Sequence, residues 1–232
     1  TFEQSLGFPA LSVVPGQFLI KDAASLGLSL LLLGEGLKQY VLGARNKTKK
    51  IQIGDRIEQT FLTVANKPIP IPNKHGRLTH MQFRRWEGCP ICHTHLGEFR
   101  SRANEIEKAG IQELIFFHSK PEEVAEFQHD MPFDMVGDPD KRFYREFGVE
   151  ASLSAFSSPT VFLAAIKGMA ALSMNLKMTK NGPLGLPADI LVGPDGRVVA
   201  VKYGEHAYDQ WSVEQLLALA QSELFRRGTL AA

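Results

Sequence analysis

Three things are scarce in this sequence of 232 residues: cysteine, an excess of charge of one sign, and long apolar stretches free of charged residues. Only two cysteines occur, which excludes a scaffold stapled by disulfides. The 26 basic and 25 acidic residues leave a formal charge of +1, so no concentrated basic surface is expected and nucleic acid is not an expected partner. A hydrophobic content of 44% with 22% charged residues is ordinary for a globular protein with a sizeable core.

The amino-terminal part of the chain is its most apolar region. Ala23 to Gly34 carries no charge and is rich in leucine, and apolar flanks extend the stretch to residues 17–43, which is long enough to cross a bilayer. Charged residues interrupt the longer stretch and would be costly inside a membrane: Lys21, Asp22, Glu35 and Lys38. A signal peptide fits poorly, because no basic region precedes the apolar core and no small-residue cleavage pattern follows it.

Two interpretations of residues 17–43 stay open. One is a membrane segment, because the basic cluster at residues 45–50 is of the kind that stays on the cytoplasmic side of a membrane helix. The other is a helix that packs on the protein's own surface or on a second subunit. The run from Gly16 to Asp22, with the small residues, leucines and glycines after it, resembles the last helix of small DoxX-like bacterial membrane proteins over about residues 1–45. That resemblance implies the tail of a membrane protein joined to a further domain.

From Ile53 onward the pattern changes to alternating strands and helices. Strands are expected at 60–64, 78–83 and 113–117, and a hairpin at 188–192 and 197–201 around the turn at 193–196. Helices are expected from the cysteine pair to Ala109, and at 121–128, 138–147 and 212–225. Residues 67–72 are broken by proline and cannot form a central strand. This order predicts an α/β sandwich with a mixed central sheet flanked by helices, preceded by the apolar helical segment.

The expected domain organisation follows from these patterns. Residues 1–50 form the apolar helical segment with its basic linker, and residues 51–232 form one α/β domain. Within that domain, residues 151–185 are predicted to be a long insertion, whose middle, 159–174, has the pattern of an amphipathic helix.

Both cysteines lie in one motif, Cys89-Pro90-Ile91-Cys92, between an expected strand and an expected helix. Free backbone N–H groups at a helix start favour a thiolate, which is the nucleophile of thiol chemistry. The second thiol lies one turn further along, so the pair can attack a disulfide or peroxide and then close its own ring. Pro90 suits the first helical position, where its missing N–H has no cost. The motif therefore predicts redox chemistry at Cys89 and Cys92.

Three rival interpretations of the pair stay open. A structural zinc site could use Cys89, Cys92 and His95, although a second cysteine pair is lacking. Cys89 to His93 also matches the haem-attachment pattern C-x-x-C-H. The third interpretation is two inert buried thiols.

Neighbouring residues supply weaker candidates. Trp86 could cover the cysteine pair, and His93 and His95 could lower the pKa of a thiol as nearby cations, or could face solvent. Leu186 and Pro187 precede the hairpin, where a cis-proline would offer backbone to an extended substrate.

The motifs together resemble the AhpC/TSA group, in its peroxiredoxin-like branch with a C-x-x-C, over about residues 53–219. The resemblance rests on Gly88 to Cys92, on Gly137-Asp138-Pro139-Asp140 leading into Phe143 to Val149, and on Leu186 to Val198. It implies a thioredoxin fold, with Pro187 as the cis-proline facing the thiols and the segment after Val149 as a branch-specific insertion.

The sequence departs from that family in two places. Peroxiredoxins carry P-x-x-x-T-x-x-C, and aligning the last cysteine on Cys92 puts Arg85 at the proline and Cys89 at the threonine. The hydroxyl that helps to bind peroxide is therefore missing. In thioredoxin-like use, Cys89 attacks first and Cys92 resolves; in peroxiredoxin-like use, Cys92 takes the peroxide oxygen and Cys89 resolves. We expect Cys89 to attack first, because a helix start would expose it.

These observations predict a thiol–disulfide oxidoreductase that reduces peroxides or protein disulfides through Cys89 and Cys92. Trp86, Pro90, Leu186 and Pro187 are the expected substrate-binding residues, and neither cofactor nor metal is expected. Expected partners are a cellular reductant of the thioredoxin or glutathione type and a second copy of the chain in a homodimer. The expected location is the cytoplasm, with membrane attachment through residues 17–43. The alternative is a non-catalytic, membrane-tethered thioredoxin-fold module for interaction or redox sensing.

Overall fold

The computed structural model describes residues 49–129, 131–149 and 185–228, together with Leu26, Leu30 and Gly34. Contacts along the chain divide it into two units, Thr1–Asn46 and Lys47–Ala232. In the first unit the three described residues are helical, and both leucines are exposed. Among the described residues no helix is long and apolar enough to span a bilayer. The predicted insertion at 151–185, except for its last residue, and most of residues 17–43 lie outside the described residues.

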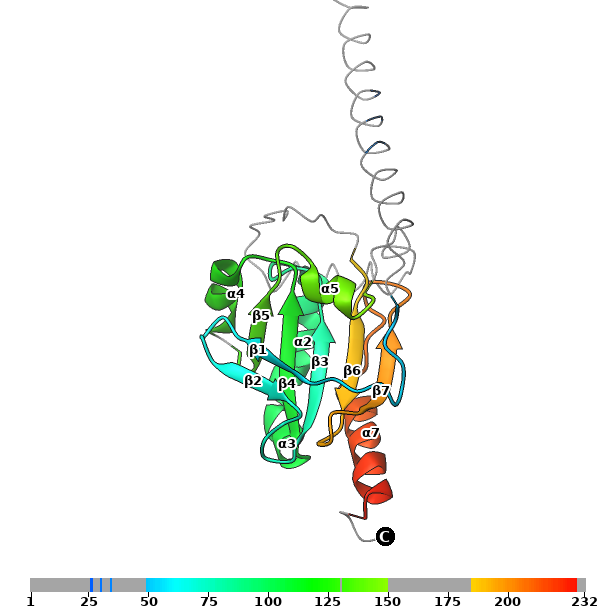
Figure 1. Ribbon diagram of the computed structural model, residues 1–232. Helices are drawn as coiled ribbons and strands as arrows, with labels where there is room; N and C mark the ends of the chain where they lie inside the picture. The colour runs from blue at the N-terminus through cyan, green and yellow to red at the C-terminus, as the bar shows by residue number, and fades with distance from the viewer. Residues whose placement is uncertain are drawn as a thin grey trace, which may run out of the picture. The chain divides into compact units, whose positions relative to one another are not determined.

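The second unit is built on a five-stranded mixed sheet with the strand order β5-β4-β3-β6-β7 (Figure 1). The strands are β3 (Leu78–Phe83), β4 (Ile111–Phe117), β5 (Asp134–Gly137), β6 (Ala188–Val192) and β7 (Val198–Tyr203). The first three are parallel to one another, and β6 and β7 run antiparallel to their neighbours. The predicted mixed sheet and its closing hairpin are confirmed.

A separate hairpin lies outside this sheet. Its strands β1 (Gln59–Leu62) and β2 (Pro68–Ile71) pair antiparallel with each other. Prolines at positions 68 and 70 of β2 lack an N–H to donate, which suits a two-stranded edge and not a central strand. The expectation that residues 67–72 stay out of the central sheet is therefore confirmed, although they do form a short strand.

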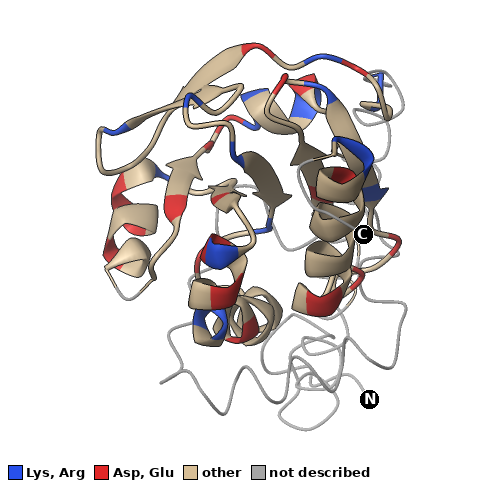
Figure 2. Ribbon diagram, turned by 90° about the horizontal axis from the view of Figure 1, so that it is seen from below, with Lys and Arg blue, Asp and Glu red and all other residues tan. Residues whose placement is uncertain are grey.

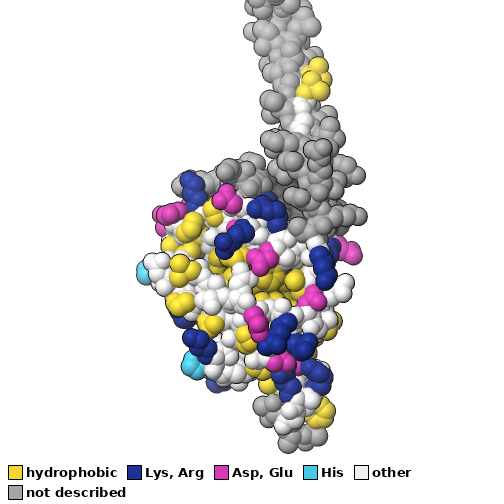
Figure 3. Space-filling view, viewed as in Figure 1, with side chains coloured by type: hydrophobic (Ala, Val, Ile, Leu, Met, Phe, Trp, Pro, Cys, Tyr) yellow, Lys and Arg dark blue, Asp and Glu magenta, His cyan; other side chains and the backbone are white. Residues whose placement is uncertain are grey.

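Helices cover both faces of the sheet. They are α2 (Pro90–Ser101), α3 (Ala103–Lys108), α4 (Pro121–Gln128), α5 (Arg142–Glu146) and α7 (Val213–Arg226). Viewed from below, α2, α3, α4 and α7 lie on one side of the sheet, and the β1–β2 hairpin lies on the other (Figure 2). Two buried clusters match these sides: one joins β1, β2 and α5 to the sheet, and the other joins α2, α3, α4 and α7 to it. On the face that carries α5, acidic and basic side chains are interspersed with hydrophobic ones (Figure 3).

Two helix predictions need correction. The single helix expected from the cysteine pair to Ala109 is two helices, because Arg102 leaves helical geometry with φ −115° and ψ 19°. The expected helix at 138–147 begins only at Arg142, because the Asp138 carboxylate accepts hydrogen bonds from the N–H groups of Arg142 and Phe143, at 2.9 and 2.8 Å. Leu96 and Phe99 of α2 and Ile106 of α3 are all buried in one cluster.

Strand β3 is buried along its whole length and contains polar residues. Successive side chains of a strand point to opposite faces. Met81 and Phe83 join the α5-side cluster, whereas Leu78 joins the cluster on the α2 side. On this α2 side the ring of His80 lies 5.9 Å from that of Phe99 and 5.6 Å from that of Trp211. The centre of the domain therefore holds polar side chains on one face of its middle strand.

Candidate active site

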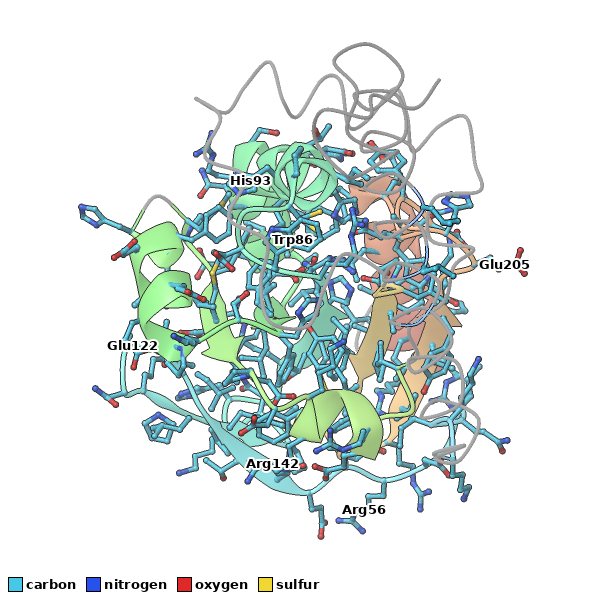
Figure 4. The ribbon with its side chains drawn as sticks, turned by 90° about the horizontal axis from the view of Figure 1, so that it is seen from above. Arg56, Trp86, His93, Glu122, Arg142 and Glu205 are labelled. Carbon is cyan, nitrogen blue, oxygen red and sulfur yellow. The ribbon has the colours of Figure 1, made fainter. Side chains whose placement is uncertain are left out.

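The two cysteines lie where β3 passes into α2. Cys89 is the N-cap residue of α2, and its Sγ accepts a hydrogen bond from the backbone N–H of Cys92 at 3.4 Å. Pro90 occupies the first helical position, as predicted. Both cysteines are free thiols. Figure 4 looks down on this end of the sheet, with Trp86 near the start of α2.

Both thiols are buried, contrary to the expectation that the helix start exposes Cys89. Cys89 has an exposed fraction of 0% and Cys92 of 1%. The reason is a small apolar cluster around the two sulfur atoms, consisting of Trp86, Ile91 and Ala207 with the half-buried Leu186 and Tyr208 against it. The structure therefore brings Trp86 and Leu186 to the cysteine pair, as predicted from their positions.

A cation lies against the first sulfur. Arg85 Nη2 donates a hydrogen bond to Cys89 Sγ at 2.9 Å, and the arginine is itself 2% exposed. Its guanidinium also stacks over the ring of Trp86, with 5.0 Å between the central carbon and the ring centre. In the sequence, Arg85 stands out only as the residue at the position of the family's proline. The available signal was a cationic residue four positions before a helix-start cysteine, since such a cation lowers the pKa of a thiol.

One of the two thiols, Cys92, loses its proton readily, whereas the other, Cys89, keeps its proton. Burial alone would raise the pKa of Cys92, but the hydrogen bond from the Cys89 thiol and the charge of Arg85 outweigh it and lower that pKa to about 5. Burial and the neighbouring Cys92 sulfur raise the pKa of Cys89 well above its ordinary value. The pair therefore holds one thiolate at neutral pH, centred on Cys92, with Cys89 as its thiol partner.

The prediction of a cis-proline at Pro187 is wrong. Among the described residues the cis peptide bond is Ile71–Pro72, so the bond between Leu186 and Pro187 is trans. The Pro187 carbonyl accepts a hydrogen bond from Gly204 N–H at 2.9 Å. A trans bond is the ordinary preference of an X-Pro peptide, and here the carbonyl is already bonded within the domain instead of being offered to a substrate.

The two histidines of α2 occupy different environments. His93 Nε2 is bonded to the Glu87 carbonyl, and its ring lies 4.5 Å from that of Phe127. His95 is buried, and its Nε2 donates to the Trp211 carbonyl at 2.8 Å. Burial, and then the charge of Arg84, lower the pKa of His95 to about 3. His95 is therefore neutral and cannot be the cation that favours the thiolate; Arg85 fills that role.

In the described part of the chain, the side chains do not form a set of ligands for the zinc site considered as an alternative. No group of three or more histidine, cysteine, aspartate or glutamate side chains there could hold a metal ion. His95, the proposed third ligand, already uses its Nε2 in the bond to Trp211.

Comparisons with known proteins point in one direction. Residues 98–206 match the family described as AhpC/TSA antioxidant enzyme, a range that begins just after Cys92. No curated protein matches the chain.

Several solved peroxiredoxin structures share the fold. Peroxidoxin BcpB from Mycobacterium tuberculosis is 14% identical with a TM-score of 0.54, covering 74% of this chain and 97% of that one. A PrxQ mutant from Xylella fastidiosa is 13% identical with a TM-score of 0.54, covering 77% and 99%. A mutant of Peroxiredoxin 6 from Arenicola marina is 14% identical with a TM-score of 0.54, covering 76% and 75%. At this identity the likeness shows the thioredoxin-like fold, and the family match adds a resemblance of residues 98–206 to AhpC/TSA antioxidant enzymes, over a range that does not include the cysteine pair.

Proposed function

We propose that the protein reduces peroxides by cycling Cys89 and Cys92 between a dithiol and a disulfide. The observation that carries the proposal is the hydrogen bond from Arg85 to Cys89 Sγ inside a buried site. A buried guanidinium and the neighbouring thiol together hold one thiolate, which is the reactive form of cysteine.

Cys92 is the proposed first attacker. Its thiolate attacks one peroxide oxygen, so that an S–O bond forms and the O–O bond breaks. The departing alkoxide or hydroxide takes up a proton and leaves as alcohol or water. The Cys89 thiol then attacks the sulfenic sulfur, the S–S bond forms, and water leaves. This replaces the sequence-based expectation that Cys89 attacks first, because its premise, an exposed Cys89, does not hold.

Burial of the pair favours a small oxidant. Hydrogen peroxide or a small hydroperoxide can approach sulfur atoms that Trp86 and Leu186 surround more readily than a protein disulfide can. The disulfide then needs two electrons from a dithiol, for which a reductant of the thioredoxin or glutathione type is proposed. The proposed homodimer, the cytoplasmic location and the membrane attachment through residues 17–43 stay predictions.

A thiol count tests the proposal. The reduced protein is treated with one equivalent of hydrogen peroxide, and peroxide consumption is then followed with excess dithiothreitol. We expect both thiols to disappear together and peroxide consumption to continue over many turnovers. Cys92→Ser should abolish the consumption, whereas Cys89→Ser, treated with peroxide before any dithiothreitol is added, should stop at a sulfenic acid that a dimedone probe traps. Turnover that survives both replacements would end the proposal.

The same experiment separates the alternative. Loss of two thiols without continued peroxide consumption would favour a redox-sensing module with the same fold. Thiols that do not react at all would point to a non-catalytic domain.

A further inference from the structure

A network of buried ionic side chains lies within the sheet, on strands that adjoin the cysteine pair. His80 Nδ1 contacts both carboxylate oxygens of Glu113, at 2.9 and 3.0 Å, and His80 Nε2 contacts Asp189 Oδ1 at 3.1 Å. Asp189 Oδ1 also accepts a hydrogen bond from Arg84 Nη2 at 2.6 Å. All four side chains are buried, with exposed fractions of 5% or less. We call His80, Arg84, Glu113 and Asp189 the buried tetrad.

The pairing of the strands creates this arrangement. His80 of β3 lies directly opposite Glu113 of β4, and Asp189 of β6 lies opposite Gln82 of β3. Gln82 links Glu113 to Arg84: its Nε2 donates to Glu113 at 2.5 Å and its Oε1 accepts from Arg84 Nη2 at 2.6 Å. Taking four charges out of water is expensive, and well-packed apolar residues often serve stability as well or better. The tetrad therefore calls for a role beyond folding.

The charges of the tetrad and of the redox site balance separately in the reduced protein. His80 has its pKa raised to about 9, because the two carboxylates outweigh the opposing effect of burial. Burial would raise the pKa of Asp189, but Arg84 and His80 hold that pKa below its usual range. Two cations therefore face two carboxylates in the tetrad, while Arg85 donates a hydrogen bond to Cys89 Sγ and its charge lowers the pKa of Cys92.

Formation of the disulfide upsets this balance. It removes the negative charge of the Cys92 thiolate, and the charge of Arg85, the residue next to Arg84 in the chain, favours that thiolate in the reduced protein. Arg84 acts on Cys92 through its charge in the reduced protein, so the tetrad and the sulfur atoms influence each other electrostatically. A buried region of low polarity compensates such a change most readily by losing a proton from its most labile cation, and neither arginine can lose one.

We propose that His80 is the proton store of the redox pair, protonated when Cys89 and Cys92 are reduced and neutral when they form the disulfide. His80 does not contact the reacting sulfur atoms; it acts through Asp189 and Arg84 as a positioning residue. The inference rests on the proposed cycling of the cysteine pair.

The proton balance of the cycle fits this assignment. Oxidation of one thiolate and one thiol by a peroxide consumes one proton, which the departing alkoxide or hydroxide takes up from solvent. If His80 releases one proton to solvent in the same step, oxidation has no net proton demand. Reduction by a dithiol releases one proton, which returns to His80. The buried region keeps the same net charge in both states.

Glu113 gives the stored proton a route to solvent. It forms part of the wall of a pocket of about 490 Å³, which Asn73, Arg77, Ile106 and Phe133 also line. This pocket lies near the start of β4, whereas the cysteine pair follows the end of β3, and the two strands are parallel. The proton can therefore pass from His80 to the Glu113 carboxylate and leave on the side away from the thiols.

Other titratable groups around His80 do not compete for this role. From α2, His95 is already neutral, with its pKa lowered by burial. From the segment before α7, Trp211 presents an apolar ring and donates its backbone N–H to Asp189 at 3.2 Å. Near the sulfur atoms, burial lowers the pKa of His118 to about 3 and raises that of Tyr144, so neither changes its charge near neutral pH.

The test measures how the redox potential of the full chain depends on pH. The pair is equilibrated with dithiothreitol buffers between about pH 6 and 8, and thiols are counted by mass after alkylation. In the unmodified protein we expect two protons to be taken up per two electrons, one by Cys89 and one by His80. His80→Gln should take up one proton per two electrons. Glu223→Gln, which alters a buried carboxylate paired with Arg226 and Arg227, should behave like the unmodified protein.

A second measurement needs no variant and decides the matter if His80→Gln fails to fold. Imidazole nitrogen shifts of His80 are recorded by NMR at pH 7.5 in the reduced and the oxidised full chain. A protonated ring in the reduced state and a neutral ring in the oxidised state would support the proposal. The same ring state in both, or the same proton count in His80→Gln, would overturn it. If the thiol count shows that no disulfide forms, the proposed function fails first and the proton store falls with it.

Discussion

Arg85 Nη2 lies 2.9 Å from Cys89 Sγ, and both residues are withdrawn from solvent. A cation and a thiol in this position convert an apolar corner of the fold into a site that stabilises one negative charge. The electrostatic attraction between the guanidinium and that negative charge is stronger there than at the surface, because the surroundings are less polar than water.

Replacing Arg85 by methionine should slow the reaction with peroxide at pH 7 by about ten- to one-hundredfold, because the fraction of thiolate falls as the pKa of Cys92 rises toward that of a free thiol. Stopped-flow oxidation of the reduced protein would measure it. Arg85→Lys should lose less, since it keeps the charge. Arg56→Met, at an exposed residue paired with Glu58, is the control and should leave the rate unchanged. A normal rate in a folded Arg85→Met protein would contradict the assignment.

The reaction rate should depend on pH with a midpoint near 5. Only the thiolate reacts, and the Cys92 pKa is lowered to about 5, so the rate should fall as pH drops through that value. It should be nearly constant between about pH 6.5 and 8, where the thiolate is already formed. The rate of iodoacetamide alkylation, measured from below pH 5 up to about pH 9, checks the prediction. A midpoint near 8 to 9 would mean that Arg85 and Cys89 do not stabilise the thiolate.

Replacing Trp86 by alanine should open the site to larger reagents. Trp86 is buried in the apolar cluster around the sulfur atoms, so its removal uncovers them. The reaction with a bulky aromatic disulfide reagent should accelerate by about tenfold or more, whereas the reaction with hydrogen peroxide should change less, because the small oxidant needs less room. Phe225→Ala removes an exposed aromatic residue and serves as the control. Equal changes with both reagents would show that Trp86 does not limit access.

Stability of the reduced protein should fall as the solution becomes alkaline. The pKa of His80 is raised to about 9 in the folded protein and returns to about 6.5 on unfolding, so the folded state binds the proton more tightly. The resulting stabilisation is complete below about pH 6.5 and is lost as pH rises through about 9. Its size is on the order of 3 kcal/mol at most.

Urea unfolding of the reduced protein between pH 6 and 9.5 measures this loss. His80→Gln should be less stable at pH 6 and should show a much weaker decline over the same range. A parallel decline in the variant and in the unmodified protein would assign the effect to other groups.

Much of the architecture was predictable from local patterns. Short runs of strand-forming residues predicted the strands at 78–83 and 188–192, and the turn Gly193 to Gly196 predicted the hairpin that joins the second of these to β7. Pro90 after Cys89 predicted the start of α2, because proline suits the first helical position. The break at Arg102 was not predictable, because its side chain is held by Glu105 and by Glu214, which lies more than one hundred residues away in the sequence.

The sequence by itself determined that two cysteines spaced for ring closure stand at a helix start in an α/β fold. Spacing along a helix and the strand period are local properties, and local sequence encodes them. Tertiary structure alone decided that the thiols are buried, that Arg85 donates a hydrogen bond to Cys89 Sγ, that Pro187 is trans, and that His80 lies between Glu113 and Asp189. These features depend on strand register and on packing between segments distant in the chain, and charges change a pKa only through distances that packing sets.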